Sequence, residues 1–177
     1  MAYDFKNVNI LVVECSSSMY QLLKTVLNML TIPNKNVYDA YTPKEAFGKF
    51  LSVKHDLIIT DWLENPDRGI ELTRMIRQNP KSPNPYVPII MTAGSGHIHR
   101  VIKARDVGVS DYVVKPFSAQ VLANRLSRII EDNRQFVVCE KYVGPDRRRP
   151  HIKGKYDGPE RRVAGIDAVE ASSAQHA

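Results

Sequence analysis

The most regular chemical pattern in the sequence is an eight-residue motif that occurs twice near the C-terminal end. The two copies read KYVGPDRR and KYDGPERR and occupy residues 141–148 and 155–162. A tyrosine ring offers a flat stacking surface, and paired arginines present planar donor forks to phosphate or to guanine O6 and N7. A carboxylate complements the N–H donors on the Watson–Crick edge of guanine. Each copy therefore suits a ligand with flat bases and phosphates, and two copies favour a ligand with two equivalent halves.

Several ligands compete for this duplicated segment. Single-stranded nucleic acid would use the arginines and the stacking tyrosines. A membrane surface would use positive charge alone and has no need for acids or Gly-Pro pairs at fixed places. A two-fold guanine dinucleotide would use every element, so the repetition of the acids and of Gly-Pro together with the arginines favours it over nucleic acid. A solvated basic tail without a ligand is the remaining interpretation.

Positive charge is concentrated in the same segment. Residues 141–162 hold eight Lys/Arg against three Asp/Glu, whereas residues 1–140 hold 17 against 14. Such a basic stretch attracts phosphate-bearing partners. The start of the chain lacks the pattern of a signal peptide, and no window of 18 apolar residues predicts a membrane span. Cys15 and Cys139 have neither disulfide nor zinc spacing, so we expect a cytoplasmic protein without membrane insertion.

The first 140 residues alternate between apolar strands and amphipathic helices. Strands are predicted at residues 9–13, 36–41, 56–60, 86–92 and 111–115, and helices at 19–30, 43–53, 69–79, 97–108 and 118–138. The buried face of the first helix should consist of Met19, Leu22, Leu23, Val26 and Leu30. Five strand–helix repeats predict an α/β fold with a parallel five-stranded sheet covered on both faces. In such sheets, functional residues gather at the carboxyl ends of the strands.

Specific polar residues stand at those strand ends. They are Glu14 and Cys15 after the first strand, Asp61 after the third, Thr92 after the fourth, and Lys115-Pro116 after the fifth, with Tyr112 three residues before Lys115. Gly69 lies eight residues after Asp61. Together with the order of the strands, these residues resemble the receiver domain of two-component response regulators, the CheY-like (βα)5 flavodoxin-like fold. The resemblance covers about residues 7–137.

The resemblance implies a role for each of these residues. Asp61 would be the phosphoacceptor, Lys115 the cation beside it and Thr92 the hydroxyl that holds a phosphoryl oxygen, while Tyr112 would be the rotamer switch. Magnesium would take oxygen atoms from Asp61, from the backbone of Leu63 and from the acidic pair after the first strand. A histidine kinase is the implied partner for phosphorylation.

The sequence departs from the family pattern at the acidic pair. The usual two carboxylates are replaced by Glu14 and Cys15, and Cys15 stands where the resemblance implies a direct magnesium ligand. A neutral thiol is a poor ligand for this hard ion, and Glu14 would have to move to reach it. The segment WLENPDRG after Asp61 also lacks the Met-Pro usual in the family. These departures argue against efficient magnesium binding and phosphorylation. We expect Cys15 to be a small buried residue at the strand end and not a redox sensor.

The basic tail carries a second resemblance, which extends to about residue 162. A receiver domain followed by GPDRR-type repeats is similar to the CheY-like cyclic di-GMP effectors, the Cle family. In that family, the tail binds cyclic di-GMP, commonly as an intercalated dimer, and the receiver domain binds the flagellar motor switch or adhesion machinery. The implied ligand contacts are Tyr142, Gly144, Pro145, Asp146, Arg147, Arg148 and Arg149 in the first copy, with Tyr156, Gly158, Pro159, Glu160, Arg161 and Arg162 in the second.

These interpretations give three segments and one preferred function. Residues 1–138 would form the receiver domain, residues 139–164 the duplicated ligand-binding segment and residues 165–177 a disordered tail. Cyclic di-GMP would order the mobile Arg-rich tail and change the surface around the fourth helix, fifth strand and fifth helix. That change would alter binding to the flagellar motor switch, recruit the protein to the flagellated pole or motor, and so control motility and surface attachment. A phosphorylation-dependent response regulator with an incidental tail and an RNA-binding regulator are the alternatives. We expect no enzyme, because no nucleophile–base pair is visible beyond the receiver site.

Overall fold

A computed structural model describes residues 5–63, 67–130, 135–139, 142–146 and 167–169. Within these residues, five parallel strands form one sheet: β1 (Ile10–Val13), β2 (Val37–Ala40), β3 (Leu57–Asp61), β4 (Ile89–Ala93) and β5 (Asp111–Val114). Their order across the sheet is β2-β1-β3-β4-β5. The register places Asp61 of β3 beside Thr92 of β4. The predicted parallel five-stranded sheet is confirmed.

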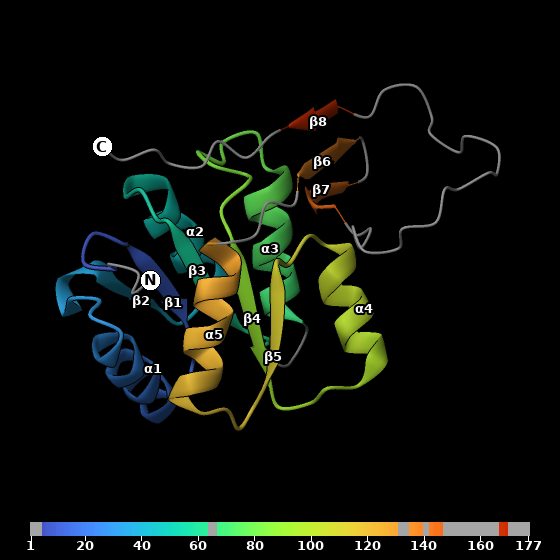
Figure 1. The fold of residues 1–177 in the computed structure, drawn as a ribbon. Coiled ribbons are helices and arrows are strands. Elements are labelled where there is room, and N and C mark those ends of the chain that lie inside the picture. Colours follow the sequence, from blue (N-terminus) through green and yellow to red (C-terminus); the bar gives the residue numbers. More distant parts are fainter. Residues whose placement is uncertain (1–4, 64–66, 131–134, 140–141, 147–166, 170–177) are drawn as a thin grey trace.

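Helices cover both faces of this sheet. They are α1 (Ser17–Met29), α2 (Pro43–Ser52), α3 (Arg68–Gln78), α4 (Ile98–Asp106) and α5 (Ala119–Ile130), with a short 3-10 turn, η1, at Asn34–Asn36. α1 and α5 pack on one face, while α2, α3 and α4 pack on the other (Figure 1). Because both faces are covered, the apolar runs of β1 and β4 are buried along their whole length.

The buried face of α1 matches the prediction in part, because Leu23 and Val26 are buried and Met19 and Leu30 pack against the same core. This face consists of Tyr20, Leu23, Val26 and Leu27, whereas Leu22 is 48% exposed. A stripe centred on Tyr20, Leu23 and Leu27 also satisfies the 3.6-residue period. This rotation of the helix buries the large ring of Tyr20 and turns Leu22 toward solvent.

The last predicted helix is too long. α5 ends at Ile130, and Phe136–Cys139 forms strand β6. This strand pairs in antiparallel orientation with β7 (Tyr142–Pro145) on one side and with β8 (Asp167–Val169) on the other. Val137 and Val138 are β-branched and fit an extended strand better than a helix once such partners are present.

The three-stranded sheet also bears on the predicted division of the chain. The boundary between residues 138 and 139 lies inside β6. The first Gly-Pro pair lies in β7, an edge strand, where the missing N–H of proline is tolerated. Residues 147–166 and 170–177 lie outside the described residues, so the proposed division into three segments stays a prediction.

Candidate functional site

The carboxyl ends of the strands bring four of the predicted site residues together. Glu14 follows β1, Asp61 ends β3, Thr92 lies in β4 and Lys115 follows β5. Lys115 Nζ lies 2.6 Å from Glu14 Oε2 and 2.8 Å from Asp61 Oδ1. The buried Glu14 also accepts a hydrogen bond at Oε1 from the backbone N–H of Ser16, at 3.0 Å. The ammonium group of Lys115 is thus held between two carboxylates.

Lys115 is the central charge of this cluster. Burial by itself lowers the pKa of Lys115, but the hydrogen bonds and charges of Asp61 and Glu14 outweigh burial and hold the pKa above its usual value. The backbone N–H of Lys115 donates to Ala93 O at 2.8 Å, which keeps this residue beside β4. Lys115 is therefore charged at neutral pH and balances one of the two carboxylates.

The loop after β3 is shaped around Asp61. The backbone N–H of Leu63 donates to Asp61 Oδ2 at 3.0 Å, and Leu63 has a φ of 52°. The first turn of α3 approaches so closely that a Cβ atom at Gly69 would stand 2.4 Å from the carbonyl oxygen of Asp61. Only glycine permits this approach, which explains the spacing between Asp61 and Gly69 that the sequence shows.

Thr92 and Tyr112 have different surroundings. Thr92 is fully buried, and its Oγ1 has no hydrogen-bond partner among the described residues. Because Thr92 is the register partner of Asp61, its side chain extends from the same face of the sheet. Tyr112 Oη donates to Ser95 O at 2.6 Å. Burial and the nearby Asp61 raise the pKa of Tyr112, although Arg100 opposes the shift.

The sequence analysis missed a set of contacts that ties the Asp61 loop to α4. Trp62 Nε1 donates to Asp67 Oδ1 at 2.8 Å, and Asp67 also forms an ion pair with Lys103. The hydrogen bond from Lys103, followed by that from Trp62, lowers the pKa of Asp67. Arg100 Cζ lies 5.2 Å from the centroid of the Trp62 ring, and the rings of Trp62 and Tyr112 meet edge to face at 6.4 Å. The spacing of Arg100 and Lys103, three residues apart on one helix, was the available signal.

The donor atoms of the Lys115 cluster fit magnesium poorly. Glu14, Cys15 and Asp61 each bring one possible ligand atom within 4.8 Å of the others. Each carboxylate oxygen of Glu14 and Asp61 already contacts either Lys115 or a backbone N–H. The third donor is the thiol of Cys15, whereas Mg²⁺ requires oxygen ligands in nearly ideal octahedral geometry. The prediction that Cys15 is buried is wrong: it follows the last residue of the buried strand β1 by two positions and is exposed.

Residues 142–146, the described part of the first copy of the duplicated segment, pack against the receiver. Tyr142, Gly144 and Pro145 lie in β7, and the backbone N–H of Asp146 donates to Gln135 O at 2.8 Å. Tyr142 Oη donates to Pro145 O at 2.8 Å, so this ring folds back along its own strand. The other predicted ligand contacts, at residues 147–149, 156 and 158–162, lie outside the described residues. Their role stays a prediction.

A buried arginine that the sequence analysis missed anchors this hairpin. Arg77, near the end of α3, is 3% exposed and donates four hydrogen bonds of 2.7–3.1 Å to the backbone carbonyls of Gly108, Pro85 and Val87. Its Cζ lies 5.4 Å from the centroid of the Phe136 ring in β6. Burial lowers the pKa of Arg77, but a guanidinium stays charged in proteins.

Two glycines let β7 approach the receiver backbone closely. Gly108 follows α4 with a φ of 92°, and a Cβ atom there would stand 2.3 Å from Val143 O. A Cβ atom on Gly144 would stand 2.6 Å from Gly108 Cα. Neither position accepts a side chain unless β7 moves. This contact lies where α3 and α4 end, at the opposite end of these helices from Asp61 (Figure 1).

The parallel sheet, with Asp61, Thr92 and Lys115 at its carboxyl edge, defines a CheY-like receiver domain. The sequence profile of the response regulator receiver domain matches residues 10–127, and the chain belongs to this family. The match ends within α5, so β6, β7 and β8 lie beyond it.

Chemotaxis proteins are among the similar proteins. The chain is 32% identical over 124 residues to chemotaxis protein CheY of Pseudomonas aeruginosa, which covers 70% of this chain and 97% of that protein. It is 34% identical over 125 residues to the chemotaxis protein CheY homolog of Campylobacter jejuni, covering 70% and 92%. A crystal structure of a putative response regulator from Chloroflexus aurantiacus superposes with a TM-score of 0.63 at 27% identity and covers 71% of this chain and 98% of that one.

None of the helices in the described part of the chain has the length and apolar character needed to cross a bilayer.

Proposed function

We propose that this receiver-domain protein is a signalling switch that binds cyclic di-GMP through its duplicated C-terminal segment. The observation that carries the proposal is the position of residues 142–146, the described part of the first copy, against the receiver. β7 pairs with β6 and packs on Gly108, and the arginines of the same copy follow at residues 147–149. A ligand that bridges both copies would tie residues 155–162 to a fixed point on the receiver.

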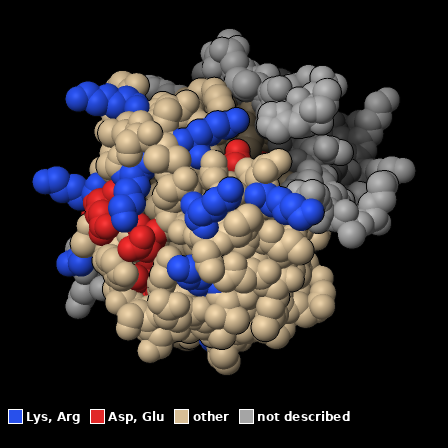
Figure 2. Space-filling view, turned by 90° about the vertical axis from the view of Figure 1, so that its left-hand side faces the viewer, with Lys and Arg blue, Asp and Glu red and all other residues tan. Residues whose placement is uncertain are grey.

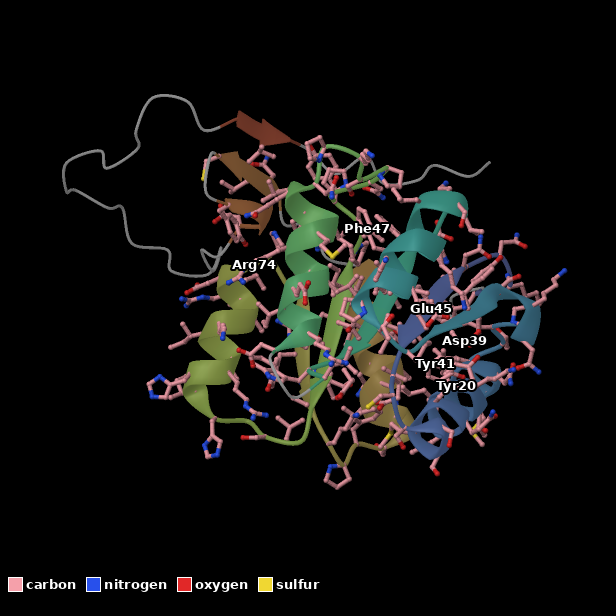
Figure 3. The ribbon with its side chains drawn as sticks, turned by 180° about the vertical axis from the view of Figure 1, so that it is seen from behind. Tyr20, Asp39, Tyr41, Glu45, Phe47 and Arg74 are labelled. Carbon is pink, nitrogen blue, oxygen red and sulfur yellow. The ribbon has the colours of Figure 1, made fainter. Side chains whose placement is uncertain are left out.

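The distribution of charge supports a ligand on the C-terminal segment. On the face of the molecule shown in Figure 2, most of the acidic surface forms one patch with Lys and Arg side chains beside it, and other Lys and Arg side chains are spread over uncharged surface. Some cations are paired within the receiver itself: Lys49 contacts both Asp39 and Glu45, which lie close together in Figure 3. Dense positive charge occurs in residues 141–162, where each copy also supplies a tyrosine and an acid for guanine.

The proposed output is a change in binding to the flagellar motor switch. Apolar side chains are exposed on α4, β5 and α5, namely Ile98, Ile102, Val114 and Val121. Such residues suit a protein partner, and the relatives named CheY are chemotaxis proteins. Because β7 contacts Gly108 at the end of α4, ordering the tail would change the surroundings of this face. We propose that the switch thereby recruits the protein to the motor and controls motility and surface attachment.

Calorimetric titration of the full chain with cyclic di-GMP tests the ligand. The variant Arg147→Ala/Arg161→Ala removes one arginine from each copy, and we expect it to bind at least about tenfold more weakly, because a hydrogen bond to a charged group contributes about 1.5–3 kcal/mol. The matched variant Lys44→Ala/Arg128→Ala removes the same charge from exposed positions on α2 and α5 and should bind like the parent. Point variants are preferable to truncation at residue 140, which would delete β7 and uncover Arg77. Equal affinity of the parent and the arginine variant would overturn the site assignment.

The same proteins distinguish the nucleotide from RNA. A dinucleotide site should prefer cyclic di-GMP over single-stranded RNA and depend weakly on salt. Binding to RNA would instead weaken steeply as salt rises, because each neutralised phosphate releases counterions. A steep salt dependence without preference for cyclic di-GMP would favour the RNA-binding alternative.

Binding to a purified flagellar motor switch protein tests the output. We expect cyclic di-GMP to change the affinity of the parent, and we expect Ile98→Lys on α4 to weaken binding with or without the ligand. Met29→Lys is the matched control, because Met29 is an equally exposed apolar residue on α1, outside the proposed face. If Ile98→Lys and Met29→Lys bind the motor switch protein equally well, the proposed face on α4 is wrong. If cyclic di-GMP leaves the affinity of the parent for that protein unchanged, the proposed switching mechanism is wrong.

A phosphorylation-dependent regulator is the second candidate. Lys115 Nζ lies 2.8 Å from Asp61 Oδ1, and the unpartnered hydroxyl of Thr92 lies on the same face of the sheet, so an oxygen atom added at Asp61 would find a cation and a hydroxyl. Labelling by radioactive acetyl phosphate that is lost in Asp61→Asn would support it. Absence of labelling in the parent and in Cys15→Asp would contradict it.

A further inference from the structure

We propose that Glu14, Cys15 and Asp61 form a binding site for a thiophilic divalent cation of the Zn²⁺ class, in place of the Mg²⁺ site expected of a receiver domain. The three side chains come from the ends of β1 and β3, and their possible ligand atoms lie within 4.8 Å of one another. This inference is independent of the cyclic di-GMP proposal.

The distances within the cluster suit a tetrahedral ion. In zinc sites the metal lies about 2.3 Å from sulfur and about 2.0–2.2 Å from carboxylate oxygen, which places sulfur and oxygen ligands about 3.5 Å apart. Cys15 Sγ lies 3.9 Å from Glu14 Oε1, so this pair needs to close by only a few tenths of an ångström. All three possible ligand atoms lie within 4.8 Å of one another, so Asp61 needs to move by no more than about 1.3 Å. The thiol of Cys15 is exposed and can meet an ion from solvent.

The charges of the cluster favour a metal that bonds to sulfur over a hard ion. Lys115 already balances one of the two carboxylates, so the attraction for any dication is weaker than in a site with several free carboxylates. When a thiophilic cation binds, the Cys15 thiol releases its proton to solvent and becomes a thiolate ligand. The cation, the three anionic ligands and Lys115 then form a neutral cluster. Mg²⁺ has little affinity for thiolate, so it would not gain this stabilising bond to Cys15.

A buried hydroxyl beside the cluster points to a further ligand. Thr92 Oγ1 has no hydrogen-bond partner among the described residues and extends from the same sheet face as its register partner Asp61. A four-coordinate ion with three protein ligands keeps one open position, which water or an anion fills. The Thr92 hydroxyl is placed to hydrogen-bond an oxygen atom at that position, which would satisfy a buried polar group that is otherwise unpaired.

Titration of the full chain with Zn²⁺, Co²⁺ and Mg²⁺ tests the proposal. We expect Zn²⁺ to bind more tightly than Mg²⁺, and Co²⁺ to give a sulfur-to-cobalt charge-transfer band in the near ultraviolet. Cys15→Ser should lose that band and bind Zn²⁺ at least about tenfold more weakly, because even changes to residues behind metal ligands cost 10–100-fold in affinity. Cys15→Asp should reverse the preference toward Mg²⁺.

Two matched variants test other candidate zinc ligands. Cys139→Ser removes the other cysteine, and His97→Gln/His99→Gln removes the two histidines beside the start of α4. Both should keep the parent's affinity for Zn²⁺ and the cobalt band. The proposal is overturned if Cys15→Ser binds Zn²⁺ like the parent, or if the band follows Cys139 or the histidines.

Discussion

Replacement of Arg77 by methionine should release the C-terminal hairpin from the receiver. Methionine keeps an unbranched apolar side chain but removes all four hydrogen bonds that the guanidinium donates. The bonds to Gly108 O and Val87 O are buried, and a buried acceptor left without a donor costs about 1–3 kcal/mol. Two such acceptors cost about 2–6 kcal/mol, and part of this is offset because a charged group no longer has to be buried. We therefore expect a net loss of about 3 kcal/mol in the free energy of unfolding.

Urea unfolding followed by circular dichroism measures this loss, and native-state hydrogen exchange locates it. With slopes of about 1–3 kcal/mol per M urea, a loss of 3 kcal/mol lowers the midpoint by about 1–3 M. Exchange should accelerate most at the amides of β6 and β7, because these strands lose their anchor while the parallel sheet keeps its core. Arg74→Met is the matched control: Arg74 is an exposed arginine of the same helix, one turn earlier (Figure 3), and its loss should change stability by less than about 0.5 kcal/mol.

The anchoring role of Arg77 is refuted if Arg77→Met and Arg74→Met unfold at the same urea concentration. It is also refuted if Arg77→Met lowers stability while the amides of β6 keep their protection, since the guanidinium would then stabilise the receiver without holding the hairpin. A double-mutant cycle with Phe136→Leu separates the ring contact from the hydrogen bonds. The contact between Arg77 and the ring predicts a coupling of about 0.5–2 kcal/mol.

Three further changes test other parts of the structure. Gly108→Ala should lower the urea midpoint, because its Cβ would stand 2.3 Å from Val143 O and its φ is 92°. The control Gly48→Ala places a Cβ in open space in α2 and should raise the free energy of unfolding by about 0.5–1 kcal/mol. Equal effects of the two changes would contradict the close approach of β7 to Gly108. Because the pKa of Lys115 is raised, its stabilising contribution is complete below about pH 10.4 and is lost as pH rises through the folded-state pKa. The difference in urea midpoint between the parent and Lys115→Met should therefore stay constant near neutral pH and become smaller at alkaline pH. A difference that stays constant up to about pH 11.5 would contradict the ion pairs of Lys115. Burial lowers the pKa of His55, which packs against Tyr38 and Phe50. The free energy of unfolding should therefore fall as pH drops below the unfolded-state pKa of about 6.5. His55→Phe should reduce this loss of stability between about pH 7 and pH 5, and an unchanged pH profile would show that His55 does not cause it.

The sequence predicts the parts of the fold that depend on local pattern. The runs ILVV, LIIT and IIMTA consist of apolar residues apart from one threonine each in the last two, and only a sheet covered on both faces buries such strands. The position of Asp61 at a strand end and its spacing to Gly69 follow from the same pattern, and the close contact of Gly69 with the Asp61 carbonyl gives that spacing its physical reason. These features need little knowledge of residues far away in the chain.

The features that were missed depend on residues brought together by the fold. Phe136 and the two valines after it continue the helical periodicity of α5, and they become a strand because β7 and β8 supply hydrogen-bond partners. In the sequence, Arg77 resembles any charged residue on the exposed face of an amphipathic helix. Its buried position was missed because its hydrogen-bond acceptors come from the segment before β4 and from the turn after α4. The contact between Trp62 and Arg100 likewise joins a loop and a helix that are far apart in sequence.

The two ends of α3 connect the regions that the proposals concern. Gly69 packs on the carbonyl of Asp61 at the start of the helix, and Arg77 holds Gly108 and Phe136 eight residues later, about 12 Å along the axis. α4 runs between the same regions, because Lys103 pairs with Asp67 beside the Asp61 loop and Gly108 contacts β7. Packed helices shift as units and do not deform continuously. A cation at the Asp61 cluster and a ligand that orders the tail would therefore act on the position of the same helix, α4, which exposes Ile98 and Ile102 to a partner. The cation and the tail ligand could therefore bind at separate sites and still control the same partner-binding face on α4.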